Sequence, residues 1–170
     1  LNLSAPTASE LAALEQSDTQ HKALKIGIER SVPALPDVKD WVWMPVSGGQ
    51  AAQFIISSES ASNLRALVQL ESSLPTGVEL RVFSVEQTDE IYGAYQQADF
   101  KVIEGTQQLQ LWTPTVSGSQ LGLEIFVPET VNPAEVKLSV PHLSHIAYDL
   151  KTAKFKGVSE SFLKFSSCDV

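Results

Sequence analysis

The sequence predicts an all-β domain, an antiparallel two-sheet sandwich of jelly-roll type. Short runs of alternating apolar and polar residues recur along the 170-residue chain, and turn signals rich in glycine and proline separate them. A βαβ plan is excluded, because its parallel strands would be apolar on both faces and would alternate with amphipathic helices. Two stacked sheets are then the expected closure.

The length and composition indicate one globular domain of a soluble protein, with a flanking segment on each side. At 18.5 kDa the chain can bury a core of its own. We expect a helical segment at residues 1–23, the sandwich at residues 24–150 and a polar tail at residues 151–170. No apolar run approaches the roughly 20 residues that a bilayer span needs, so no membrane span is predicted. The formal charge of −8 disfavours nucleic acid as a partner.

The N-terminal segment carries the clearest helix signal. Thr7 and Glu10 have the spacing of a capping box, and the apolar residues 11–14 follow them. Ser17 and Asp18 help to end the helix.

The strands are predicted from period-two hydrophobicity. The first run alternates at Leu24, Ile26 and Ile28 until Pro33 and Pro36 break it. Further runs of strand length lie at residues 52–56, 64–70, 78–82, 121–127 and 136–140. Turn signals lie at residues 47–49, 74–77, 117–119 and 132–133. Residues 87–105 are less regular, and we expect a long connection there with room for a short strand or turn.

No catalytic residue is predicted. A chymotrypsin-like triad needs a histidine base, a carboxylate and an activated serine, but Ala-Ala-His-Cys and Gly-Asp-Ser-Gly segments are missing from this sequence. Residues 157–161 approach the Gly-x-Ser-x-Gly elbow, which requires a strand, a sharp turn and a helix. None of these is predicted there, so Ser159 is interpreted as part of the tail.

Neither a metal nor a cofactor is expected. His142, His145 and Asp149 could be imagined as ligands, but zinc needs three or four rigidly held ligands at spacings that this sequence does not offer. A histidine packed at a strand end and bonded to a neighbouring group is the favoured interpretation.

Two further side-chain sets are candidates for binding and for structure. Trp112, Tyr92 and Tyr95, together with Trp41 and Trp43, could form an aromatic platform for carbohydrate, although filling the core or its rim is the favoured interpretation. Arg65 and Glu124 interrupt otherwise apolar strands. They are predicted to form an ion pair that fixes the register of neighbouring strands.

Several motifs at characteristic spacings resemble the N-terminal region of secreted bacterial serine proteases of the lysyl endopeptidase and trypsin-like group. They are Leu64-Arg65, Leu74-Pro75-Thr76-Gly77-Val78-Glu79-Leu80, Tyr92-Gly93-Ala94-Tyr95, Leu111-Trp112-Thr113-Pro114, Leu121-Gly122-Leu123-Glu124-Ile125 and Leu143-Ser144-His145. The resemblance implies a secreted or periplasmic protein. It also implies a non-catalytic prodomain that assists or restrains a serine protease domain in cis.

The C-terminal residues extend this resemblance. Ser167-Cys168-Asp169-Val170 is similar to the Ser-Cys-Asn-Val start of the family's protease portion, apart from Asp169. Cys168 is the single cysteine, so it is either free or paired outside this sequence, and the resemblance implies such a disulfide. Lys156-Gly157 resembles the family's maturation junction, and Lys164 is the rival cleavage position. The alternatives to a prodomain are an accessory module for carbohydrate or a cell-surface component, and a permanent structural spacer.

Overall fold

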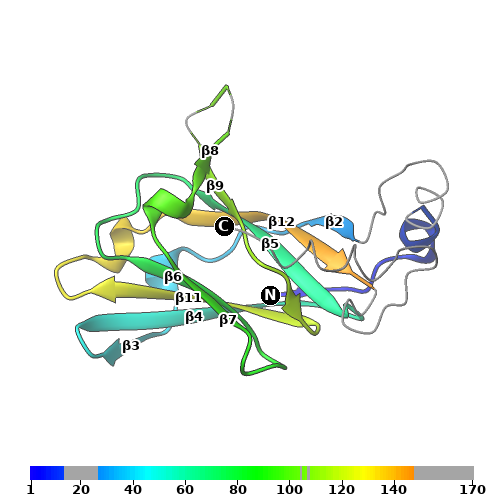
Figure 1. Cartoon of the computed structure of the whole chain (residues 1–170), viewed down its shortest axis with the longest axis horizontal. Helices are drawn as coiled ribbons and strands as arrows, with labels where there is room; N and C mark the ends of the chain where they lie inside the picture. Colours follow the sequence, from blue (N-terminus) through cyan, green and yellow to red (C-terminus); the bar gives the residue numbers. More distant parts are fainter. Residues whose placement is uncertain (14–26, 104, 107, 148–170) are drawn as a thin grey trace, which may run out of the picture.

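The computed structural model describes residues 1–13, 27–103, 105–106 and 108–147, which form two packed six-stranded sheets (Figure 1). The predicted all-β sandwich is therefore confirmed. Residues 8–13 are helical, and Thr7 and Glu10 form the predicted capping box. The backbone N–H and hydroxyl of Thr7 donate to Glu10 Oε2 at 2.7 and 2.8 Å. The remainder of the predicted helix, most of the predicted first strand and the tail lie outside the described residues.

The first sheet is built around two long strands, β4 (Gly49–Ser58) and β11 (Gln120–Pro128). Strand β11 pairs on its other side with β6 (Glu79–Ser84), which pairs with β7 (Ile91–Tyr95). The far edge of β4 is shared by β3 (Trp43–Val46) and β1 (Asn2–Leu3). Strand β1 is parallel to β4, so the prediction of antiparallel pairing fails at this position.

The second sheet has the order β2 (Ile28–Ser31), β12 (Leu138–Ile146), β5 (Asn63–Leu70), β9 (Leu109–Trp112) and β8 (Lys101–Val102). Strand β10 (Val116–Ser117) pairs with β5 beside β9. Within the described residues, short 3-10 turns lie at Val38–Asp40, Gln97–Asp99 and Pro133–Glu135. Residues 87–105, predicted as a long connection, contain both β7 and β8.

The core lies between the sheets and follows the predicted alternation. Leu121, Leu123 and Ile125 on β11 face Leu64 and other aliphatic residues of the second sheet, and all are buried. Glu124, at an outward position of β11 between these residues, is partly exposed, which suits a sheet with one solvent-facing side.

The turn at residues 117–119 joins the two sheets. The Glu86 carboxylate accepts hydrogen bonds from the Ser119 N–H and hydroxyl at 2.6 and 2.8 Å, and Ser84 Oγ donates to Ser117 O at 2.6 Å. Gly118 has φ +95°, and a Cβ there would lie 2.5 Å from the Glu86 carboxyl carbon. The turn therefore requires glycine at this position.

Candidate functional site

The predicted ion pair between Arg65 and Glu124 does not form. Both residues lie on outward positions, but Arg65 is on β5 of the second sheet and Glu124 is on β11 of the first. The core separates them. Sequence patterning gave the correct face of each strand and the wrong sheet.

Glu124 instead belongs to a charged row on the outer face of the first sheet. Its carboxylate accepts hydrogen bonds from Gln53 Nε2 at 2.8 Å and from Arg81 Nη1 at 3.2 Å. Arg81 also pairs with Glu79 at 2.7 Å, two residues along the same strand. Arg81 directly opposes Glu124 in the β6–β11 ladder. It is therefore Arg81, and not Arg65, that forms the cross-strand ion pair suited to fixing the register.

Arg65 makes two different contacts on the outer face of the second sheet. Its Nε donates to Thr113 O at 2.7 Å, and its guanidinium carbon lies 5.2 Å from the centroid of the Trp112 ring. Partial burial lowers the pKa of Arg65, although an arginine stays protonated at neutral pH. The guanidinium is thus fixed by one backbone hydrogen bond and one cation–π contact.

Thr113 supports this arrangement and was not predicted as a functional residue. It is fully buried, and its hydroxyl accepts a hydrogen bond from the Ala66 N–H at 3.0 Å where the ladder passes from β9 to β10. Pro114 follows and has no N–H to pair. The Thr-Pro dipeptide is the sequence signal that could have identified this break in the ladder.

The aromatic residues do not gather into the predicted platform. Trp112 is 38% exposed on the second sheet. Tyr92 and Tyr95 lie on β7 of the first sheet, pack against the core and oppose Val82 and Leu80. Burial raises the pKa of the Tyr95 phenol, in agreement with this packing. The three candidate binding residues therefore belong to two separate surfaces.

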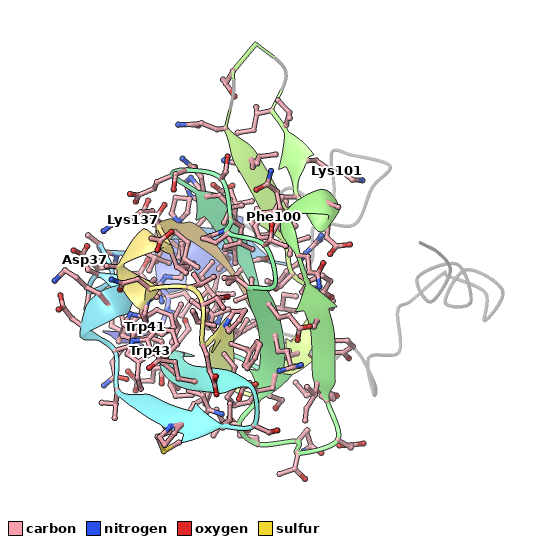
Figure 2. All side chains as sticks on the ribbon, turned by 90° about the vertical axis from the view of Figure 1, so that its left-hand side faces the viewer. Asp37, Trp41, Trp43, Phe100, Lys101 and Lys137 are labelled. Atoms are coloured by element: carbon pink, nitrogen blue, oxygen red, sulfur yellow. The ribbon has the colours of Figure 1, made fainter. Side chains whose placement is uncertain are left out.

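The other tryptophans pack as the favoured interpretation predicted. Trp41 is 7% exposed and stacks on Phe54 with ring centroids 5.1 Å apart, and its indole N–H donates to Pro36 O. Trp43 packs against the same core and donates to Val38 O at 3.1 Å. Figure 2 shows Trp41 and Trp43 close together at one end of the sandwich.

A serine–histidine contact lies in the interior rather than in a cleft. Ser58 Oγ is 2.9 Å from His145 Nδ1, and both residues are at most 1% exposed. A third polar group, Arg30, hydrogen-bonds Ser58 Oγ and the Ser4 carbonyl. A catalytic triad places a carboxylate beyond the histidine and opens the serine to substrate. Here the neighbouring group is a cation and the serine is enclosed, so the contact is structural.

The remaining histidine on β12 lies on the other face of the strand. His142 Nδ1 is 2.9 Å from Glu29 Oε1, which gives an ion pair when the imidazole is protonated. The part of the chain that the structure describes holds no group of three metal-ligating side chains that could bind an ion. Asp149 lies outside that part. No helix among the described residues is long and apolar enough to cross a membrane.

A groove of about 370 Å³ runs along the outer face of the second sheet, beside β8 and β9. Arg65, Trp112 and Lys101 line it together with Asp99, Gln110 and neighbouring apolar residues. The predicted processing residues Lys156, Gly157 and Lys164, and the cysteine Cys168, lie outside the described residues.

Comparison with known proteins gives a family match and a similar relative. The family model described as the lysyl endopeptidase N-terminal domain matches residues 2–147. A lysyl endopeptidase of Pseudomonas aeruginosa strain PAO1 is 30% identical over 149 residues, which cover 85% of this chain and 30% of the relative. The chain thus spans less than a third of that relative's length. No solved structure matches.

Proposed function

Because this chain belongs to the lysyl endopeptidase N-terminal domain family, we propose that it is a non-catalytic prodomain in a secreted or periplasmic serine endopeptidase precursor. It would assist the folding of a protease domain in cis and restrain that domain until cleavage. The observation that carries the proposal is the extent of the family match. Residues 2–147 take in every strand of the described sandwich, from β1 to β12.

Both roles need only a preformed complementary surface. A domain that binds the native protease but not its unfolded chain shifts the folding equilibrium by mass action. The same binding inhibits when it covers the substrate cleft. The sandwich has its own buried core, which supports a surface that is formed before the protease has folded.

Edge strand β3 supplies uncovered apolar surface that supports this role. Val42, which directly precedes the strand, lies at alternate positions with Met44 and Val46 of the strand, and the three are 81%, 59% and 44% exposed. Contiguous exposed apolar side chains mark protein contact sites more often than inert surface. We infer that the protease domain of the same precursor covers this stripe.

The experiment adds the 170-residue chain in trans to the separately produced protease portion of its precursor. The expected results are a higher refolding yield of the denatured protease and a dose-dependent loss of activity of the folded protease. Met44→Glu should weaken both effects, whereas Ile91→Glu places the same charge at another exposed apolar position and should weaken neither. No effect of the wild-type chain on yield or activity would contradict the prodomain role.

Processing is proposed at the lysine positions that resemble the family's maturation junction. Cleavage after Lys156 would release a protease beginning at Gly157, and cleavage after Lys164 would release one beginning at Phe165. Cys168 would remain with the protease portion in either case. There it would pair with a cysteine outside this sequence.

Carbohydrate binding stays a prediction, because the three candidate aromatic residues do not form one shared platform. Arg65 lies over the ring of Trp112, and the tyrosines Tyr92 and Tyr95 face the core of the other sheet. A sugar could stack only on the part of Trp112 that Arg65 leaves uncovered.

A further inference from the structure

We propose that the groove on the outer face of the second sheet is a carboxylate-binding site that receives an extended acidic peptide segment of a partner polypeptide. It lies beside β8 and β9, at the edge of the sheet opposite to β2 (Figure 1). The proposal goes beyond the prodomain role, because the site can be measured on the 170-residue chain by itself.

Arg65 is the first reason to expect an anion. Its Nε is taken by Thr113 O, and its plane is held over Trp112. Within the described part of the chain no carboxylate pairs with it, so both terminal nitrogens are available to a ligand. A guanidinium held in one orientation presents parallel donors that match a carboxylate, and its side-chain entropy is already lost before binding.

Lys101 is the second reason. It lies on β8 opposite Gln110 of β9. Gln110 Nε2 in turn donates a hydrogen bond to Gln69 Oε1 of β5 at 2.9 Å. Other cations, such as Lys39 and Arg81, pair with neighbouring carboxylates, but Lys101 has no such partner among the residues described.

The acidic lining residue does not neutralise these two cations directly. Asp99 Oδ2 accepts the Gln96 N–H at 2.7 Å and so caps the 3-10 turn Gln97–Asp99. The whole chain carries a formal charge of −8. An acidic ligand is therefore repelled by most of the molecule and attracted to this groove, which gives the site selectivity.

The shape of the groove favours an extended peptide over a compact anion. Strand β8 is an edge strand of two residues that pairs with β9, and the Val102 side chain is 63% exposed. A partner strand can pair with such an edge through its backbone while alternate side chains reach the sheet face. Val102, Ile103 and Trp112 give apolar contact, and Arg65 and Lys101 give the charge.

The test uses blocked heptapeptides in which glutamate alternates with valine, titrated into the full 170-residue chain at low and physiological salt. A matched peptide with glutamine in place of glutamate measures the contribution of charge. Lys101→Glu is the main variant, and Arg65→Gln is the second. Lys137→Glu is the matched control, because it makes the same charge change on the opposite side of the molecule (Figure 2).

The expected result is saturable binding of the glutamate peptide that shifts the Trp112 indole N–H resonance and weakens as salt is added. Lys101→Glu should weaken binding by about tenfold, since it replaces an attraction by a repulsion, and Arg65→Gln should weaken it similarly. Lys137→Glu should leave the affinity within about twofold. A thermal melt of each variant reports whether the fold is retained.

Three results would overturn the proposal. The first is no binding of the glutamate peptide at millimolar concentration, and the second is equal affinity for the glutamine peptide. The third is preferential binding of an acidic oligosaccharide such as oligogalacturonate, which would assign the groove to a different ligand class. None of these results bears on whether the chain inhibits or folds a protease.

Discussion

Ser58 Oγ lies 2.9 Å from His145 Nδ1, so a hydroxyl of the first sheet is joined to an imidazole of the second in the interior of the sandwich. Arg30 on β2 also contacts Ser58 and reaches the Ser4 carbonyl in the N-terminal segment. Four separate parts of the chain therefore meet at one polar cluster, and its Ser58–His145 contact is buried. Its protonation should affect the stability of the whole domain.

The first prediction concerns acid destabilisation through His145. Burial lowers the pKa of His145, the Arg30 charge lowers it further, and Glu10 acts in the opposite direction. On unfolding, the imidazole regains its ordinary pKa of about 6.5. Below that pH the unfolded chain binds a proton that the folded chain does not. The stability from this group is complete above about pH 6.5 and is lost as the pH falls towards the lowered folded-state pKa.

Urea unfolding between pH 8 and pH 5 measures this effect. The free energy of unfolding should decline below about pH 6.5 by up to about 1.4 kcal/mol per pH unit, and His145→Gln should flatten that decline. His142→Gln removes a histidine on the other face of β12 and should retain it. Hydrogen bonds to Thr7 lower the pKa of Glu10 from its ordinary value, so this carboxylate stays ionised across the window. An unchanged slope in His145→Gln would contradict the assignment.

The second prediction concerns the break in the ladder between β9 and β10. Thr113→Val keeps the shape of the side chain but removes the acceptor for the Ala66 N–H, which then has no partner in the interior. An unpaired buried donor costs about 1–3 kcal/mol. Chemical denaturation should show that loss for Thr113→Val and a change within about 0.5 kcal/mol for the exposed control Thr76→Val. Equal effects of the two substitutions would mean that the hydroxyl is not needed.

The third prediction concerns the close approach of Phe83 to Gly122. These residues oppose each other in the β6–β11 ladder, and a Cβ on Gly122 would lie 2.2–2.5 Å from atoms of the Phe83 ring. Gly122→Ala should therefore destabilise the domain by about 1–3 kcal/mol through overpacking. Phe83→Ala should absorb part of that cost, so a double-mutant cycle should give a coupling energy above about 0.5 kcal/mol. Additive effects would show that the ring moves away without strain.

The strands that the sequence predicted share one property. Strands β4, β5, β6, β11 and β12 each have a row of aliphatic residues facing the core, which gives a clear period of two. Strand β3 was missed because its outward side chains Met44 and Val46 are apolar and exposed, which hides the alternation. Strand β9 was missed because Leu109, Leu111 and Trp112 are all partly exposed beside an edge.

The site was harder to predict than the fold, because the partner of each charged side chain depends on which sheet its strand joins. The pattern around Arg65 and Glu124 shows that both side chains face outward, but pairing is decided by strand order, which is set by contacts distant in sequence. The groove depends on the same non-local order, since Arg65 and Lys101 come from strands on either side of β9. The motif Trp112-Thr113-Pro114 carries a family resemblance in the sequence, whereas its role in fixing Arg65 depends on the fold.

The last prediction concerns release of the domain from its precursor. If the precursor is processed after lysine, as proposed, Lys156→Gln in the full-length precursor should move the N terminus of the released protease from Gly157 to Phe165. Lys156→Gln combined with Lys164→Gln should abolish cleavage at both proposed junctions, because neither then offers a lysine. Lys151→Gln, the matched control, removes a nearby lysine and should leave the start at Gly157. N-terminal sequencing of the protease purified from culture measures each outcome, and a start at Phe155 or earlier would contradict both proposed junctions.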